Sequence, residues 1–188
     1  MSDHPLTVVK LGGALVHRPG ALDRVTRALE SAVARGEPLV VVPGGGPFAD
    51  IVRAVETSLA LGDDAAHWMA ILGMAQYAHL LVSRMTRARL VEHPERVATA
   101  LDERVLPVLS PYRWLREEDP LPHSWDVTSD SIAAWVAGRL GARRLLLVKP
   151  VVGETAGLVD AYFGRALPAA VRVIIADDQG LTEALRAG

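Results

Sequence analysis

The chain has 188 residues, a formal net charge of -2 at pH 7 and a hydrophobic fraction of 50%. That length and apolar content suit one large domain, and the lack of a basic block argues against nucleic acid or an anionic membrane as a partner. The chain has no cysteine, which excludes disulfides, thiolate metal sites and cysteine nucleophiles.

The N-terminal sequence MSDHPLTVV has no basic region followed by a long apolar run. No apolar segment approaches the roughly 20 residues that cross a bilayer. We therefore expect a soluble, cytoplasmic and unprocessed protein, with a single domain over residues 1–188.

The stretch Thr7 to Leu15, TVVKLGGAL, brings three strand-forming residues to Lys10 and then to the pair Gly12 and Gly13. Strand ends of open α/β sheets are where ligands bind, and an ammonium beside two glycine amides suits a phosphate. A tight turn alone would also explain the glycines. The lysine favours a phosphate site, because only Lys10 and Lys149 are lysines among 20 basic residues.

The strand, glycine loop and helix pattern then occurs a second time. Apolar spacing predicts a helix over Pro19 to Arg35, and the run Leu39 to Val42 is typical of a buried strand. This strand enters a loop with Gly44, Gly45 and Gly46, followed by a predicted helix over Phe48 to Leu61.

The next predicted helix, Asp63 to Met85, is apolar around much of its circumference. A second helix or a second subunit would cover such a helix, the latter giving a homodimer, but a central core helix fits the pattern equally well. We interpret His67 and His79 as packing or surface residues, because no carboxylate lies between them at metal-site spacing.

Short strands are predicted at Ala88 to Val91 and Arg104 to Leu109, with a helix near Pro94 to Leu101 between them. The stretch Ser110 to Asp126 contains three prolines and three aromatic residues, and predicts a long, ordered loop. We expect substrate contacts there, including Trp125.

A helix is predicted from Thr128 or Ser129 to Leu140, with one of these two residues as N-cap and Asp130 in the first turn. Both hydroxyl residues are also candidates for substrate binding. The remaining predicted elements are a strand Arg144 to Lys149, a helix Ala156 to Phe163, a strand Val171 to Ala176 and a helix Gln179 to Arg186. This alternation predicts an α/β fold, a three-layer α/β/α sandwich with a mainly parallel sheet.

Several familiar motifs are absent from the sequence. There is no G-x-G-x-x-G, no Gly-Lys-Ser/Thr loop, no G-x-S-x-G elbow and no zinc-spaced histidine pair, and we predict no protein-bound metal site. The groups that remain lie at strand ends: Lys10, the two glycine loops, Asp130 and Lys149. Phosphoryl transfer depends on such positioning and charge neutralisation.

Four segments together resemble the amino acid kinase family: VVKLGGAL, VVVPGGGPFAD, DAAHWMAILGMAQYAHLLVSRM and HSWDVTSDSIAA. The likeness is strongest to the branch that acts on the aminomethylfuran phosphate precursor of methanofuran, and to relatives in methylotrophic bacteria. The resemblance implies ATP with Mg²⁺ and phosphoryl transfer to an oxygen of a small carboxylate or phosphate acceptor.

The resemblance also implies roles for individual residues. Lys10 would contact the transferred phosphoryl group, the Gly12 and Gly13 amides would bind ATP phosphates, and Asp130 would orient the lysines. The loop Gly44 to Gly46 would hold the acceptor. Lys149 would replace a lysine that relatives supply from farther along the chain, so it is a candidate for both catalysis and ATP binding.

The C-terminal part departs from the family pattern, which has an acidic D-V-D-G-type segment where this chain reads LLVKPVVG. The nucleotide-binding part is shorter than in relatives. The leading hypothesis is an ATP-dependent kinase of a phosphate monoester such as aminomethylfuran phosphate, in methanofuran or methylofuran biosynthesis. The alternatives are a kinase-fold binding or assembly subunit with weak or no catalysis, and a nucleoside-monophosphate kinase.

Overall fold

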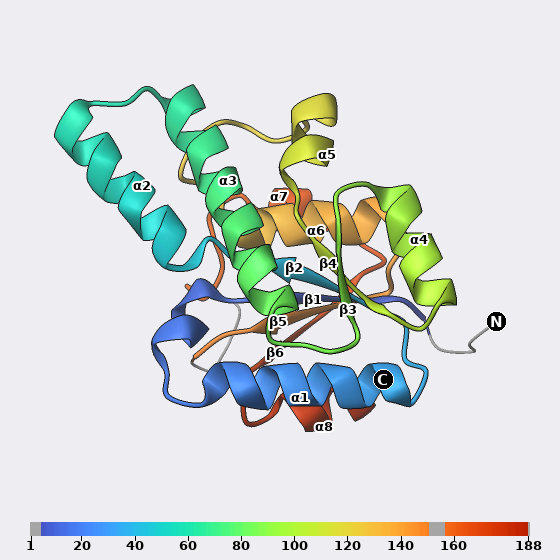
Figure 1. The fold of residues 1–188 in the computed structure, drawn as a ribbon. Helices are drawn as coiled ribbons and strands as arrows, with labels where there is room; N and C mark the ends of the chain where they lie inside the picture. Colours follow the sequence, from blue (N-terminus) through green and yellow to red (C-terminus); the bar gives the residue numbers. More distant parts are fainter. Residues whose placement is uncertain (1–4, 151–156, 188) are drawn as a thin grey trace.

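A parallel β-sheet forms the centre of the molecule (Figure 1). The structure is a computed structural model that describes residues 5–150 and 157–187. Six strands of these residues pair in parallel in the order β3-β4-β2-β1-β5-β6. They are β1 (Thr7–Leu11), β2 (Leu39–Pro43), β3 (Ala88–Val91), β4 (Leu106–Leu109), β5 (Arg144–Val148) and β6 (Arg172–Ala176).

Helices cover both faces of the sheet (Figure 1). One face carries α1 (Ala21–Ala34) and α8 (Leu181–Arg186), and the other carries α4 (Pro94–Asp102), α6 (Ser129–Arg139) and α7 (Phe163–Ala166). The remaining helices are α2 (Gly46–Leu59), α3 (Asp63–Val82), α5 (Tyr112–Glu118) and a 3₁₀ turn, η1 (Gly13–His17). The α/β/α fold class predicted from the alternation of elements is confirmed.

The period of the strands decides which way Lys10 points. Successive strand residues face opposite sides of a sheet, and in β1 Val8 packs into the core cluster under α6, whereas Val9 and Leu11 pack into the cluster over α1. Lys10 has the same parity as Val8, so its side chain projects on the α6 face. The first turn of α6 holds Asp130 on that face.

Three local predictions need correction. The stretch expected to be a long loop contains α5, which forms because Trp114 and Leu115 are buried against the core. The helix expected at Ala156 to Phe163 is instead the short α7, which begins at Phe163, and Ala156 lies outside the described residues. Thr128 stands at the N-cap position of α6, but its own side chain does not cap the helix.

Candidate active site

The two lysines of the chain meet at one carboxylate. Lys10 Nζ lies 2.8 Å from Oδ1 of Asp130, and Lys149 Nζ lies 2.7 Å from Oδ2 of the same residue. Lys10 is in β1, Lys149 directly follows β5, and the two strands are paired neighbours whose carboxyl ends lie in register. Three residues from separate parts of the chain therefore converge at one edge of the sheet.

The cluster is withdrawn from solvent, with Lys10 5% and Asp130 3% exposed. Burial lowers the pKa of the Lys10 ammonium below its usual value, and Asp130 offsets only part of this effect. Burial alone would raise the pKa of Asp130, but the Lys10 and Lys149 ammonium groups hold it below its usual value. Among the described residues the two ammonium groups share direct contact with the single carboxylate of Asp130, while Asp160 acts on Lys10 from farther away, and this arrangement suits an anionic ligand.

The glycine loops lie directly against each other. A Cβ atom on Gly13 would stand 2.4 Å from the backbone of Gly46, and one on Gly44 would stand 2.9 Å from the nitrogen of Gly13. Side chains at Gly13 and Gly44 would therefore separate the β1 and β2 loops. Backbone packing explains these glycines, a reason different from the anion access expected from the sequence.

The loop glycines differ in whether their backbone N–H already donates a hydrogen bond within the protein. The N–H of Gly12 donates to the Val148 carbonyl at 2.9 Å, and the N–H of Gly44 donates to the Leu11 carbonyl at 2.8 Å. Gly13 begins η1, so its N–H has no acceptor within that turn. An amide contact to phosphate is thus open to Gly13, whereas Gly12 would have to break its bond to β5.

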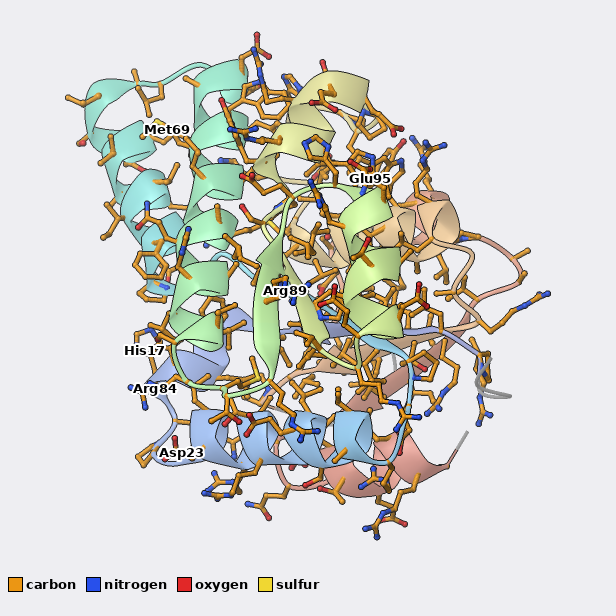
Figure 2. All side chains as sticks on the ribbon, turned by 45° about the vertical axis from the view of Figure 1, so that its right-hand side comes forward. His17, Asp23, Met69, Arg84, Arg89 and Glu95 are labelled. Atoms are coloured by element: carbon orange, nitrogen blue, oxygen red, sulfur yellow. The ribbon has the colours of Figure 1, made fainter. Side chains whose placement is uncertain are left out.

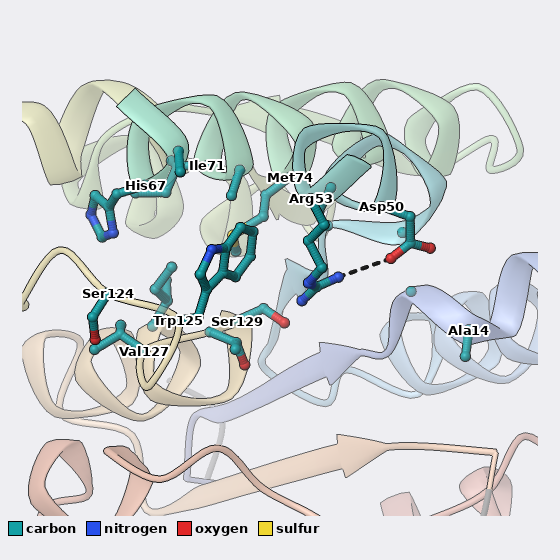
Figure 3. A pocket seen from close by; sticks show the side chains of 18 of the residues that line it. Ala14, Asp50, Arg53, His67, Ile71, Met74, Ser124, Trp125, Val127 and Ser129 are labelled. Atoms are coloured by element: carbon teal, nitrogen blue, oxygen red, sulfur yellow. Dashed lines mark hydrogen bonds and ion pairs between the residues drawn. The ribbon is translucent and has the colours of Figure 1, made fainter. Parts of the chain in front are cut away.

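A pocket of about 280 Å³ opens beside the cluster, between the glycine loops, α2, α3 and the start of α6. Of the residues expected to hold the acceptor, Gly45, Gly46, Trp125, Thr128 and Ser129 line it, whereas Gly44 does not. Ser129 directly precedes Asp130 in the first turn of α6, so one wall of the pocket belongs to the same turn as the carboxylate that holds the two lysines. Figure 3 shows Trp125 in the middle of the pocket, between His67 and Arg53.

Asp160 is an important residue that the sequence reasoning missed. Its carboxylate accepts hydrogen bonds from the N–H of Thr128 at 2.9 Å, the hydroxyl of Thr128 at 2.7 Å and the N–H of Ser131 at 3.0 Å, and also from the Ser131 hydroxyl. It therefore caps α6 from a distant part of the chain and fixes the turn that carries Asp130. No local pattern links Asp160 to α6.

The pocket wall contains three further residues that the sequence patterns assigned to no site: Asp50, Arg53 and His67. The Arg53 guanidinium lies 4.5 Å from the centroid of the Trp125 ring and pairs with Asp50 at 2.8 Å. The Trp125 indole N–H donates to Glu56 at 2.6 Å, so α2 holds this side chain at both its face and its edge. His67, interpreted as a packing or surface residue, also lines the pocket.

Residues 5–153 match the amino acid kinase family. The chain belongs to this family. It is 27% identical over 177 residues to the [5-(aminomethyl)furan-3-yl]methyl phosphate kinase of Methanocaldococcus jannaschii, a match that covers 93% of this chain and 77% of the relative. The resemblance inferred from the motifs is confirmed, and the amino acid kinase described here is a phosphotransferase.

Solved structures show the same fold at low sequence identity. Uridylate kinase from Archaeoglobus fulgidus superposes with a TM-score of 0.73 at 14% identity, over 97% of this chain and 96% of that one. UMP kinase from Ureaplasma parvum gives a TM-score of 0.67 at 12% identity, over 93% and 90% of the two chains.

A helix that crosses a membrane has to be both long and predominantly apolar. None of the helices in the described residues combines the length and the apolar character that spanning a bilayer needs.

Proposed function

We propose that this amino acid kinase uses ATP and Mg²⁺ to phosphorylate a phosphate monoester such as aminomethylfuran phosphate, in methanofuran or methylofuran biosynthesis. The observation that carries this proposal is the convergence of Lys10 and Lys149 on Asp130 next to a pocket of acceptor size. The relative from Methanocaldococcus jannaschii supplies the candidate acceptor.

The strand ends fit the phosphates of ATP. The two lysines and the N-terminus of α6 lie at the same edge of the sheet, and both favour an anion. Among the described residues no three His, Cys, Asp or Glu side chains gather where they could hold a metal. This suits Mg²⁺ that is coordinated largely by ATP oxygens and water, as this ion commonly is.

In the proposed reaction an oxygen of the acceptor phosphate bonds to the γ-phosphorus of ATP, while the bond from that phosphorus to the bridging oxygen breaks and its electron pair leaves with ADP. Lys10 and Lys149 neutralise charge on the transferred oxygens. Asp130 holds both ammonium groups in place, and Asp160 holds the turn that carries Asp130.

We also propose a single domain over residues 1–188 with a shortened nucleotide-binding part after β5, where the described residues form only α7 before β6. Because ATP would be the donor, we place the reaction in the cytoplasm. A homodimer through α3 and α2 is proposed because Ile51, Leu59 and Leu72 are apolar and 62%, 69% and 41% exposed.

The test is transfer of label from γ-labelled ATP with Mg²⁺ to aminomethylfuran phosphate, uridine monophosphate or a carboxylate acceptor. We expect a labelled diphosphate with the furan compound. Labelling of uridine monophosphate alone would make the protein a nucleotide kinase. If no acceptor is labelled and ATP does not raise the melting temperature, the protein is a binding or assembly subunit instead.

A further inference from the structure

The pocket has two chemically different ends. At one end Gly46 packs against Gly13 of the β1 loop, and Ser129 directly precedes Asp130 in α6. His67 and Ser124 line the other end, on the far side of Trp125 in Figure 3, and the exposed Asp63 also lines the pocket. Asp63 and His67 are four residues apart in α3, so they lie one turn apart on the same face of the helix.

His67 is held in its neutral form. Its ring stacks on His123 with centroids 4.1 Å apart, and the two nitrogens of His123 contact Asp64 at 2.6 Å and Asp119 at 2.8 Å. These hydrogen bonds raise the pKa of His123 and so favour its protonated, positively charged form. Burial, together with that charge, lowers the pKa of His67 to about 4. A neutral imidazole does not repel a cation, and its unprotonated nitrogen can accept a hydrogen bond.

Asp63 brings an uncompensated negative charge within one helical turn of His67. The other carboxylate on the pocket wall, Asp50, is paired with Arg53, whereas Asp63 has no ion pair or hydrogen-bond partner within residues 5–150 and 157–187. A carboxylate in the first turn of α3 also offsets the helix dipole. That role explains a negative charge at this position, but it does not require the charge to border a cavity.

The two ends therefore suit an acceptor with opposite charges at its two ends. We propose that Asp63, His67 and Ser124 form a subsite for a primary ammonium group of the acceptor, while its ring lies against Trp125 and its phosphate points to Lys10. The subsite rests on the proposed kinase function and specifies its substrate class. It favours a compact amine-bearing phosphate ester over a nucleotide, which has no ammonium group to place there.

The experiment compares two acceptors, aminomethylfuran phosphate and the same furan methyl phosphate without its aminomethyl group. In Asp63→Asn we expect KM for the amine-bearing acceptor to rise about tenfold, the effect of losing one charge-assisted hydrogen bond. KM for the amine-free acceptor and for ATP should stay within about twofold of wild type. Ser124→Ala should show the same selective loss at a smaller size.

Glu95→Gln is the matched control, because Glu95 is an exposed carboxylate in the first turn of α4 and lies outside the pocket lining (Figure 2). It should leave both KM values unchanged. Equal effects of Asp63→Asn on the two acceptors, or no effect on either, would overturn the subsite.

Calorimetric titration of each acceptor without ATP separates this inference from the proposed function. Tighter binding of the amine-bearing compound, reduced by Asp63→Asn, would support the subsite even if no phosphoryl transfer occurred. Equal binding of the two compounds to the wild-type protein would refute it even if both were phosphorylated.

Discussion

Lys149, which follows β5, donates a hydrogen bond to the same Asp130 carboxylate that forms an ion pair with Lys10 of β1. Each carboxylate oxygen has one lysine, so the two cations are held side by side despite their mutual repulsion. Such an arrangement is costly without an anion, because two buried ammonium groups share one carboxylate.

Replacing Lys10 by Met should abolish most turnover while the fold persists. Met keeps much of the buried volume of the side chain but removes the ammonium that would face the transferred phosphoryl group. We expect kcat to fall by at least about 100-fold, the range seen when one preorganised charge-stabilising donor is lost. Steady-state kinetics and circular dichroism measure the two effects, and a kcat close to wild type would remove Lys10 from the mechanism.

Asp130→Asn should destabilise the protein, because two neighbouring ammonium groups lose their shared counter-charge. A free energy of unfolding lower by about 3–5 kcal/mol is expected for a broken buried pair. The double variant Lys10→Met/Asp130→Asn should recover part of this loss, since only one ammonium then remains. Urea denaturation of the wild type and the three variants checks both statements. A double variant that is less stable than Asp130→Asn alone would contradict the charge explanation.

Asp160→Ala should weaken the start of α6, because Thr128 and Ser131 lose the carboxylate that accepts their hydrogen bonds. We expect a stability loss of about 1–2 kcal/mol and a lower kcat, since Asp130 lies in the same turn. Glu30→Ala is the matched control, because Glu30 accepts similar bonds from Thr86 and Arg87 on the α1 side of the sheet. It should lower stability without lowering kcat, and an equal loss of kcat in both variants would deny Asp160 a special role.

The pKa values of the two stacked histidines, His67 and His123, should be shifted in opposite directions from the usual histidine value. NMR titration is expected to place the pKa of His67 at about 4 and that of His123 above 6.5. His123→Phe keeps a ring for stacking and removes its charge, so the pKa of His67 should rise but stay below 6.5 because of burial. An unchanged pKa of His67 in this variant would mean that His123 exerts no electrostatic effect on it.

The same shifts predict how stability depends on pH. The pairing of His123 contributes stability that is fully present below about pH 6.5 and is lost as pH rises through its folded-state pKa. His67 has the opposite effect on stability. Between about pH 6.5 and pH 4 its imidazole is protonated in the unfolded chain but neutral in the folded protein, so stability falls as pH is lowered through this range. Comparing denaturation curves of wild type and His67→Phe between pH 4 and 7 isolates the second contribution.

The exposed apolar side chains of α2 and α3 should bury against a second copy of the chain. Light scattering of the wild type should give the mass of a dimer, and Leu72→Glu should shift it toward the monomer. Arg89→Glu, on the edge strand β3, serves as a control for adding negative charge elsewhere on the surface (Figure 2). A wild-type monomer across micromolar concentrations would rule the dimer out.

Local sequence patterns predicted much of the fold because they report burial directly. The run RLLLV became β5, and the strand expected at Ala88 to Val91 has those same bounds. The prediction of a loop around Trp114 was wrong. Three prolines suggested a loop, but burial of Trp114 and Leu115 stabilises a helix between Pro111 and Pro120. Propensity is a weak guide wherever tertiary packing decides.

The sequence by itself determined the alternating fold, the family and the three residues, Lys10, Asp130 and Lys149, whose types suit phosphoryl transfer. Only the tertiary structure decided that these side chains meet, that Gly12 and Gly44 use their amides within the protein, and that Asp160 and His67 belong near the site. The physical reason is that residue type and period are local properties. Which strand ends lie side by side depends instead on the order of strands in the sheet, and that order places β1 between β2 and β5.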